Sequence, residues 1–213
     1  MTRPAVSSPK PDALGRANAD ARSRVLSTAY NLFCRQGVQA TGIDRIVAEA
    51  GVAKMTLYRH FRSKEELVLA VLDLREELWS NRWLIAEAKR RGDTPREQLL
   101  AIFDLFDGWF HQPDYEGCLL NNVLLESRER PIRAACIAKR QNVLAFLRSL
   151  TDAAGARDPD SLARQWQLLM TGAMVEVAGG DLGAARRAHA MGALLLEQEQ
   201  RAPLAKDQPA VGG

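Results

Sequence analysis

The segment from Thr41 to Lys64, TGIDRIVAEAGVAKMTLYRHFRSK, constrains the fold more than any other part of the chain. It predicts two short helices joined by a tight turn. Gly51 stands where the first helix should end, because glycine tolerates the left-handed backbone of a helix C-terminus. Val52 follows as a small apolar plug behind the turn. Thr41 and Asp44, three residues apart, are expected to cap the first helix.

The second helix of this segment combines an apolar back with a cationic front. Leu57 and Phe61 lie four residues apart and therefore face the same way, toward the core. The other side carries polar and basic side chains, namely Lys54, Thr56, Tyr58, Arg59, His60, Arg62 and Lys64. A short helix of this kind fits the shape and charge of the DNA major groove. The competing interpretation is an ordinary solvated helix face; the turn glycine, the plug valine and a tyrosine among basic residues favour DNA.

The distribution of charge supports the same interpretation. Residues 1–65 contain eleven Lys or Arg against five Asp or Glu, a net charge of +6, whereas residues 66–213 carry eighteen against twenty-one, a net charge of −3. Positive charge concentrated in one part of a chain is typical of a phosphate-binding surface. The remainder is mildly acidic, so it is expected to serve another purpose.

Two stretches of the sequence resemble one protein family. GVAKMTLYRHFRSKEEL is similar to the recognition helix, and the start of the next helix, of the TetR family of bacterial transcriptional repressors. The upstream VLSTAYNLFCRQGVQATGIDRIVAEA is similar to that family's first two helices. The resemblance covers about residues 20–70 and implies a ligand-responsive repressor that binds a double-stranded DNA operator as a homodimer.

The resemblance also implies roles for individual residues. Lys54, Met55 and Tyr58 would contact base edges, and Thr56, His60 and Lys64 would contact phosphates. Thr41 would contact the DNA backbone at the start of the first helix of the motif. Two positions depart from the family pattern: Gly42 stands where relatives usually have Ser or Thr, and Met55 replaces a commonly smaller residue.

The rest of the chain has helical patterns and no strand pattern, so the expected fold is all-α: a three-helix helix-turn-helix head followed by a helical body. Expected helices run from about residue 20 to 36, from Ser63 to about Arg91, from Pro95 to His111 and over a short stretch after Gly117. Three more are expected from Pro131 to about Ala154, over 161–178 and over 182–200. The predicted domains are a flexible arm (1–19), the DNA-binding head (20–66), the effector-binding and dimerisation body (67–201) and a disordered tail (202–213).

Aromatic residues in the body suggest a site for a small apolar or amphipathic effector. The candidate lining residues are Phe103, Phe106, Trp109, Phe110, Leu119, Asn122 and Val123. The competing interpretation is that this aromatic stripe is ordinary core.

The last two long helices carry an apolar stripe interleaved with small residues, which favours packing against a second copy in a four-helix arrangement. The residues of this predicted dimer interface are Leu162, Trp166, Leu169, Ala173, Val177, Ala188, Met191 and Leu195. The alternative is that the stripe faces the protein's own core. A two-fold dimer that reads two half-sites favours the interface.

Other function classes are poorly supported. The three histidines lack metal-ligand spacing, and no GxSxG, phosphate-loop or GxGxxG motif occurs, so neither an enzyme nor a metal or cofactor site is expected. Three sparse cysteines, no apolar run of membrane-spanning length and no signal-peptide pattern predict a cytoplasmic protein without membrane contact. The alternative function is a helical regulator controlled by oxidation of Cys118 or by a protein partner, with no small-molecule inducer. Glu126, Arg128, Glu129 and Arg130 are interpreted as a solvated surface.

Overall fold

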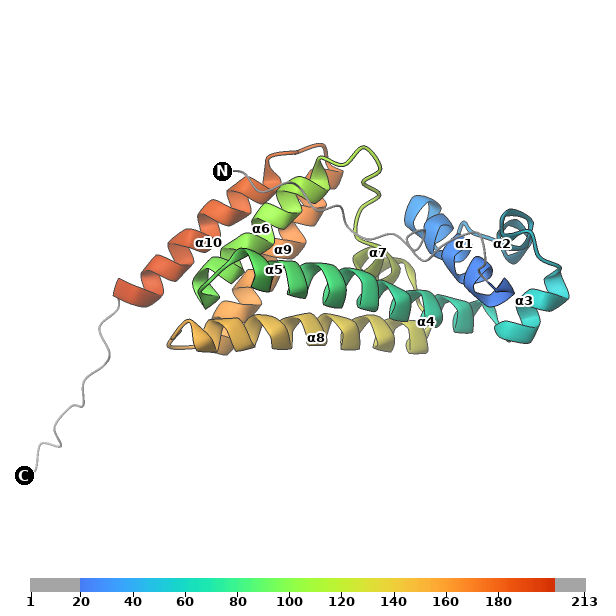
Figure 1. The fold of residues 1–213 in the computed structure, drawn as a ribbon, viewed down its shortest axis with the longest axis horizontal. Helices are drawn as coiled ribbons and strands as arrows, with labels where there is room; N and C mark the ends of the chain where they lie inside the picture. The colour runs from blue at the N-terminus through green and yellow to red at the C-terminus, as the bar shows by residue number, and fades with distance from the viewer. Residues whose placement is uncertain (1–19, 202–213) are drawn as a thin grey trace, which may run out of the picture.

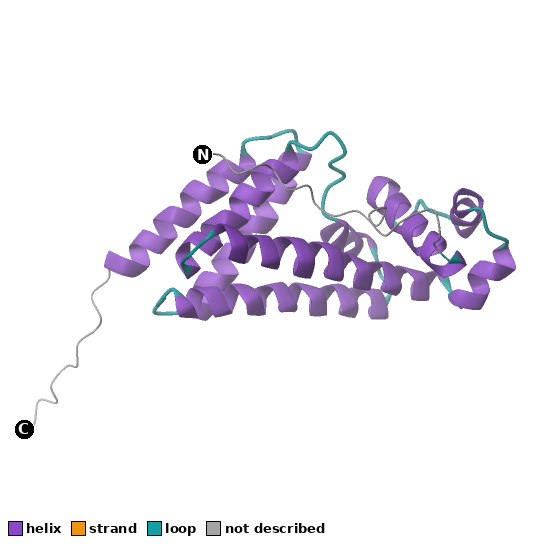
Figure 2. Cartoon of the chain, viewed as in Figure 1, coloured by secondary structure: helices purple, strands orange, loops and turns teal. Residues whose placement is uncertain are grey.

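The computed structural model describes residues 20–201 of the chain. Within this range every regular element is a helix, which confirms the predicted all-α fold (Figures 1 and 2). The predicted arm (1–19) and tail (202–213) lie outside the described residues.

Three short helices form one end of the molecule, here called the head: α1 (Ala21–Gln36), α2 (Ile43–Ala50) and α3 (Lys54–His60). The carboxylate of Asp20 accepts a hydrogen bond of 2.7 Å from the backbone N–H of Ser23 and so caps α1. Gly51 ends α2 with φ +63° and ψ +42°, the left-handed conformation predicted from the sequence.

The expected cap of α2 is wrong. The N-cap residue is Gly42, and it makes no side-chain hydrogen bond to the helix. Thr41 is fully buried, and its hydroxyl donates backward to the carbonyl oxygen of Gly37 at 2.7 Å. The hydroxyl serves the turn after α1 because burial requires it to find a partner there.

A continuous helical stretch leads from the head into the body. It comprises α4 (Lys64–Arg75), a π-helical segment η3 (Glu76–Ile85) and α5 (Ala86–Arg91). The prediction that this stretch reaches about Arg91 is confirmed, although the apolar pattern gave no sign of the π-helical segment. At the start of α4 the Ser63 hydroxyl accepts from the Glu66 N–H at 3.1 Å, whereas the Glu66 carboxylate accepts from Arg62 and not from Ser63. Only half of the predicted capping box therefore forms.

The remaining helices are α6 (Pro95–Phe110), α7 (Leu119–Glu126), α8 (Arg130–Ala153), α9 (Pro159–Ala178) and α10 (Ala184–Arg201). They agree with the predicted spans to within a few residues. A complete capping box between Thr94 and Glu97 starts α6, and Pro95 occupies its first turn.

Aromatic side chains make up much of the body core. Phe103 and Trp166 pack with their ring centroids 5.4 Å apart, and Trp166 donates from its indole N–H to the Leu99 carbonyl at 3.3 Å. A Cβ atom placed on Gly192 would lie only 2.7 Å from the Trp166 ring. Glycine therefore lets α10 approach α9 and α6 closely at this level.

The head does not have a core of its own. Its buried residues form one cluster with residues from α7 and α8, namely Leu119, Val123, Ile132 and Cys136. Glu126, at the end of α7, accepts hydrogen bonds from the backbone N–H groups of Val38 (3.0 Å) and Gln39. The interpretation of Glu126 as part of a solvated surface is therefore wrong, because its carboxylate satisfies free donors in the turn after α1.

One buried lysine joins α8 to the helix that leads into the head. The Lys139 ammonium, on a residue only 8% exposed, lies 2.6 Å from a carboxylate oxygen of Asp73 and 2.8 Å from one of Glu76. Burial alone would raise the pKa of Glu76, but hydrogen bonds from Lys139 and Asn142 and the Lys139 charge hold it below its usual value. Burial lowers the pKa of Lys139, yet its hydrogen bonds and ion pairs with Asp73 and Glu76 raise it overall.

We predict that Lys139→Met lowers the free energy of unfolding at neutral pH by about 1–3 kcal/mol, between the values for exposed and buried ion pairs. The pKa of Glu76 is lowered in the folded state, so this group stabilises the fold at pH values above its pKa in the unfolded chain. That stabilisation is lost as the pH falls through its pKa in the folded protein. The pKa of Lys139 is raised, so this group stabilises the fold below its pKa in the unfolded chain and stops doing so as the pH rises through its pKa in the folded protein. The contribution should therefore span roughly pH 5 to pH 10.

Urea unfolding across this pH range measures both effects. The matched control is Arg148→Met. Arg148 lies on α8, like Lys139, but its ion pair with Asp160 is solvent-exposed, so its loss should change the free energy of unfolding by less than about 0.5 kcal/mol. Equal losses for the two variants would contradict the prediction.

Candidate nucleic-acid interface

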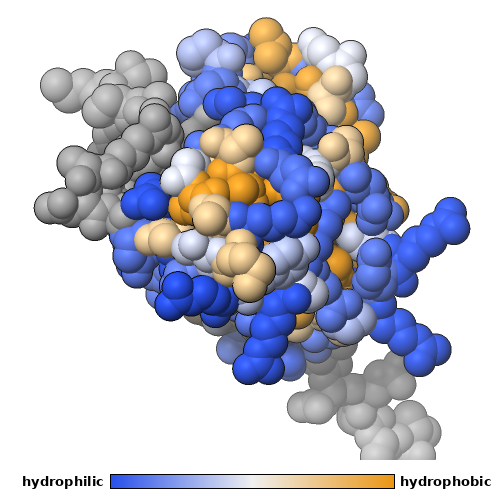
Figure 3. All heavy atoms as spheres, turned by 90° about the vertical axis from the view of Figure 1, so that its right-hand side faces the viewer, coloured by the Kyte–Doolittle hydropathy of each residue, from blue (hydrophilic) through white to orange (hydrophobic). Residues whose placement is uncertain are grey.

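The helix α3 is held by its apolar side and exposes the opposite one. Leu57 is fully buried and Phe61, which directly follows the helix, is 1% exposed, so both are fixed in the cluster that the head shares with α7 and α8. Met55, which precedes Leu57, is 73% exposed. Tyr58, which lies between Leu57 and Phe61, is 39% exposed. The end of the molecule formed by the head presents a largely hydrophilic surface with a hydrophobic patch near its centre (Figure 3). An exposed side with both apolar and basic groups suits the edges of bases, where methyl groups and acceptors alternate.

Lys54 opens α3 and is held in place by the preceding helix. Its ammonium lies 2.7 Å from a carboxylate oxygen of Asp44 on α2, and both side chains are solvent-exposed. The hydrogen bond to Asp44, followed by the Asp44 charge, raises the pKa of Lys54, so this side chain is cationic at neutral pH. The pair orients Lys54 but must open or be shared when the ammonium contacts an acceptor on DNA.

The other predicted phosphate contacts lie around the same helix. His60 is exposed, and Thr56 and Lys64 are half-buried. Arg59 and Arg62 are also exposed here, although the sequence did not assign them a role. Their charge was visible in the sequence, but the direction of each side chain was not.

The structure does not support the predicted contact between Thr41 and the DNA backbone. Its side chain is buried and bonded to Gly37, so its hydroxyl does not reach a phosphate in this conformation. Its neighbour Gly42 is exposed at the N-terminus of α2, with φ −83° and ψ 153°, and a Cβ added there would meet no atom within 4 Å. The free N–H groups of α2 therefore start at a position open to solvent, where an anion is favoured.

The predicted effector residues do not form one cluster. Phe103, Phe106, Trp109 and Phe110 are all buried in the body core and pack on one another, as the competing interpretation expected. Leu119 and Val123 belong instead to the cluster of the head, and Asn122 is exposed. The aromatic stripe of α6 did not identify a ligand site, because helical periodicity shows which side of a helix is buried but not whether protein or ligand lies against that side.

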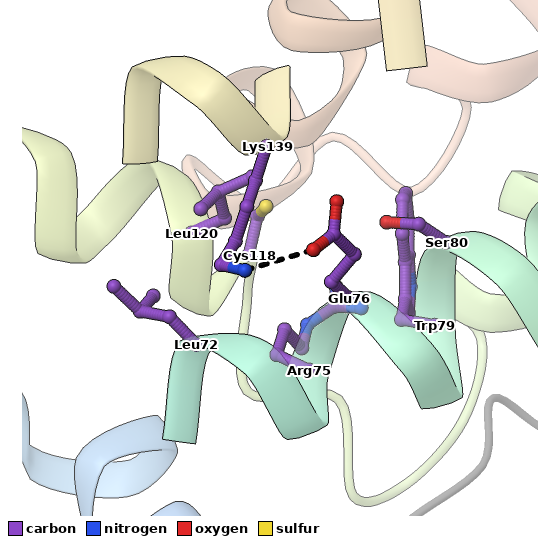
Figure 4. A pocket seen from close by; sticks show the side chains of 8 residues that line it. All are labelled: Leu72, Arg75, Glu76, Trp79, Ser80, Cys118, Leu120 and Lys139. Carbon is purple, nitrogen blue, oxygen red and sulfur yellow. Dashed lines mark hydrogen bonds and ion pairs between the residues drawn. The ribbon is translucent and has the colours of Figure 1, made fainter. Parts of the chain in front are cut away.

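A cavity does lie nearby, between the two clusters. It holds about 250 Å³, part of it open to solvent, and side chains from α4, η3, α7 and α8 line it (Figure 4). The lining residues are Leu72, Arg75, Glu76, Trp79, Ser80, Cys118, Leu120 and Lys139. The sequence predicted none of them as ligand residues. The available signal was Arg75, which follows Val68, Val71 and Leu72 on the buried side of one helix.

Most residues of the predicted dimer interface belong to the core of a single chain. Leu162, Trp166, Ala173, Val177 and Ala188 are at most 6% exposed, and Leu169 and Leu195 pack against the same core. Only Met191, at 55% exposure, is on the surface. The stripe thus faces inward, as the alternative held, because α9 and α10 use it to pack on each other and on α6. The exposed apolar residues of these helices are Leu168, Val175, Met191 and Leu194.

In the described part of the chain, no helix combines the length and apolar character that crossing a membrane requires. Residues 20–201 likewise contain no group of three or more His, Cys, Asp or Glu side chains arranged to hold a metal ion.

Comparison with known proteins adds independent information. The profile described as "Bacterial regulatory proteins, tetR family" matches residues 25–71. The HTH-type transcriptional regulator LmrA of Bacillus subtilis is 33% identical over 122 residues, which cover 55% of this chain and 63% of LmrA. The uncharacterized HTH-type transcriptional regulator YerO of the same species is 31% identical over 110 residues, covering 51% of this chain and 38% of YerO. The chain thus spans less than two thirds of these curated relatives.

Solved structures extend the similarity beyond the head. A TetR-family transcriptional regulator from Streptomyces coelicolor is 30% identical with a TM-score of 0.77, and the match covers 84% of this chain and 95% of that one. A TetR transcriptional regulator from Chloroflexus aurantiacus is 27% identical with a TM-score of 0.73, again over 84% of this chain and 95% of the other.

The open position at Gly42 leads to a test. We predict that Gly42→Ser stabilises the head by a few tenths of a kcal/mol, because serine is a better N-cap than glycine and the site has room for its side chain. The same hydroxyl lies where α2 would face a phosphate, so affinity for duplex DNA should rise by about two- to tenfold for each head, as for one added neutral hydrogen bond. Thermal unfolding and fluorescence anisotropy measure the two effects.

Gly42→Ala is the matched control, since it adds a Cβ without the hydroxyl and should not raise DNA affinity. An equal gain for alanine and serine would show that chain stiffening, and not a new contact, is responsible.

Proposed function

Because the chain belongs to the TetR family of bacterial regulatory proteins, we propose that it is a sequence-specific DNA-binding repressor that a small ligand releases from its operator. The observation that carries this proposal is the exposed side of α3, fixed in place by the buried Leu57 and Phe61. A rigidly held helix is what direct readout requires, since each base contact depends on placing a side chain within hydrogen-bond reach.

In this proposal, three side chains of α3 face the bases. Lys54 suits the acceptor edge of guanine, Met55 suits a thymine methyl group, and Tyr58 offers both an apolar ring and a hydroxyl. Thr56, His60 and Lys64 contact phosphates and fix the register. Lys54 would exchange its partner Asp44 for a base, so the pair with Asp44 orients the side chain before binding.

The proposed repressor is a homodimer, since two half-sites about 34–36 Å apart demand two heads related by a two-fold axis. The exposed apolar residues of α9 and α10 are the surface for this contact. Leu168 and Val175 lie seven residues apart with Gly172 exposed between them, which allows a second helix to approach closely. Met191 and Leu194 continue the apolar surface on α10.

The proposed division of labour places DNA binding in residues 20–66 and effector binding and dimerisation in residues 67–201. Binding of a ligand in the body would favour a dimer whose heads are spaced wrongly for the operator, provided the ligand binds the two states with different affinities. The protein would act in the cytoplasm and without catalysis.

The alternative, control by cysteine oxidation or by a protein partner, has no support from the relatives, and its redox form has little physical support. Cys118 and Cys136 are buried, and burial raises the pKa of the Cys136 thiol to about 11. A buried, protonated thiol reacts slowly with oxidants, because the thiolate is the nucleophile.

We predict that Tyr58→Ala weakens operator binding by about 2–6 kcal/mol per dimer, twice the 1–3 kcal/mol typical of one base contact. The side chain is 39% exposed, and the buried Leu57 and Phe61 that hold the helix are unchanged, so the fold should survive. Duplexes selected from genomic fragments by the protein itself provide the operator, and anisotropy at fixed salt measures affinity. Unchanged affinity in a folded, dimeric variant would contradict the assignment of α3.

We predict that Leu168→Glu together with Val175→Glu produces a folded monomer, because each residue is at least 60% exposed in one chain but would place buried charges at the dimer contact. Light scattering coupled to gel filtration measures the mass. The matched control is Leu125→Glu, which changes an 82% exposed leucine on α7 and should leave the dimer intact. A dimer that survives the double substitution would place the contact elsewhere.

A further inference from the structure

Arg75 is a buried cation that has no counter-ion within the part of the chain that the structure describes. It is the last residue of α4, where the chain passes into the π-helical segment, and it is only 5% exposed. Its Nη1 atom is buried and has no hydrogen-bond partner, and among the described residues no carboxylate forms an ion pair with it. Its guanidinium lies over the Trp79 ring, whose centroid is 4.2 Å from the guanidinium carbon.

This arrangement is unfavourable unless something else completes it. A guanidinium keeps its charge at any physiological pH, so Arg75 cannot escape burial by losing a proton. The cation–π contact recovers part of the lost hydration but satisfies no N–H donor. A buried donor left without an acceptor costs free energy, so such groups usually have a partner, and in functional sites that partner is often a ligand.

The cavity beside Arg75 has the character of a site for an acid. Leu72, Leu120 and Trp79 give it apolar walls. The other cation in the lining, Lys139, is already paired with Asp73 at 2.6 Å and with Glu76 at 2.8 Å; Figure 4 shows the pair with Glu76. Glu76 also lines the cavity, but its carboxylate is paired with Lys139, so Arg75 is the charged group of the lining that makes no direct ion pair with a described residue. The indole Nε1 of Trp79 is a second buried donor without a partner.

The surroundings add to the surplus of donors. Tyr115, whose ring centroid is 5.0 Å from that of Trp109, also has a buried hydroxyl without a hydrogen-bond partner. Burial raises the pKa of Tyr115, and the Arg75 charge opposes that rise, so the phenol stays protonated and lies within electrostatic range of the guanidinium. An acceptor-only group such as a carboxylate is the chemical complement of these donors.

We propose that this cavity binds a small monocarboxylic acid, with its carboxylate on Arg75 and its single aromatic or short aliphatic group against Trp79, Leu72 and Leu120. The empty space of about 250 Å³ includes part of the open solvent, so only a small ligand fits. The inference rests on the proposed function in that it names the chemical class of the effector.

The position of the cavity gives the ligand a route to the head. Leu72 belongs to the buried cluster of the head, whereas Trp79 and Cys118 belong to that of the body. Burial raises the pKa of Tyr30 on α1 to about 12, and the Arg75 charge opposes that rise too, which places the guanidinium close to the head. A carboxylate that draws Arg75 toward the cavity would therefore act at the point where the two clusters meet.

The test compares acids with neutral molecules of the same shape. Benzoate, phenylacetate and hexanoate are titrated into the full chain, with benzamide, phenylacetamide and hexanamide as the neutral partners. Tryptophan fluorescence and titration calorimetry report binding without DNA. We expect at least one acid to bind about tenfold or more tightly than its amide. Equal binding of every acid and its amide, or no binding of any acid, overturns the proposal.

The variants assign the preference to Arg75. Arg75→Met should abolish the acid preference, and in the absence of ligand it should unfold at the same or a higher temperature than the parent, since it removes an unpaired buried charge. The matched control is Arg82→Met, an exposed arginine on the same continuous helix that pairs with Glu77 and should keep the preference. If Arg75→Met does not fold, Arg75→Lys serves instead and should weaken acid binding at least about tenfold, because the ammonium lacks the two-pronged geometry.

Retention of the acid preference by a folded Arg75→Met variant, or undiminished acid binding by Arg75→Lys, overturns the proposal. The outcome is separate from that for DNA binding: operator binding without any acid binding rejects this inference alone, whereas acid binding without operator binding rejects the proposed function and leaves the site standing.

Discussion

The orientation of α3 depends on the packing of one cluster of buried side chains that head and body share. Leu57 and Phe61 anchor the helix in this cluster, and Leu119 and Val123 of α7 complete it from the other side. A three-helix unit of this size buries little apolar surface alone, so its stability depends on the added contacts. The hydrogen bonds from the Val38 and Gln39 backbone to Glu126 fix the same contact electrostatically. The exposed side of α3 is therefore presented by the whole molecule, and not by the head alone.

This shared packing explains how events in the body could reach the DNA. The head is joined to the body through α4 and η3 on one side and through α7 on the other, and the cavity lies between these two connections. The Lys139 bridge to Asp73 and Glu76 holds α8 against the first connection. π-Helical segments are rare and often occur at functional sites. Because η3 is continuous with α4, a displacement of η3 relative to α8 would be passed on to the head.

The sequence predicted what depends on neighbours in the chain and missed what depends on distant partners. Helix ends at Gly51, Asp20 and Thr94 were predictable, because capping is a matter of a few residues. The dimer residues were not, since α9 is apolar on two sides and periodicity does not say which side meets its own core. Glu126 and Thr41 failed for the same reason: their partners are a backbone turn 87 or 88 residues away in one case and the preceding turn in the other. The site residues of α3 were assigned from resemblance, and burial of Leu57 and Phe61 gives them a physical basis.

Arg75 unites these points, because it is costly to the free protein and lies where the head meets the body. A fold that needed only stability would place an apolar residue there, since the neighbours Leu72 and Trp79 are apolar and the position is buried. An uncompensated charge makes the free state less stable than it could be, and any ligand that neutralises the charge gains that energy on binding. The gain belongs only to conformations in which Arg75 faces the cavity, so it biases the equilibrium between conformations and not merely the occupancy of the site. A ligand that binds two head orientations equally well would leave the operator affinity unchanged, however tightly it bound.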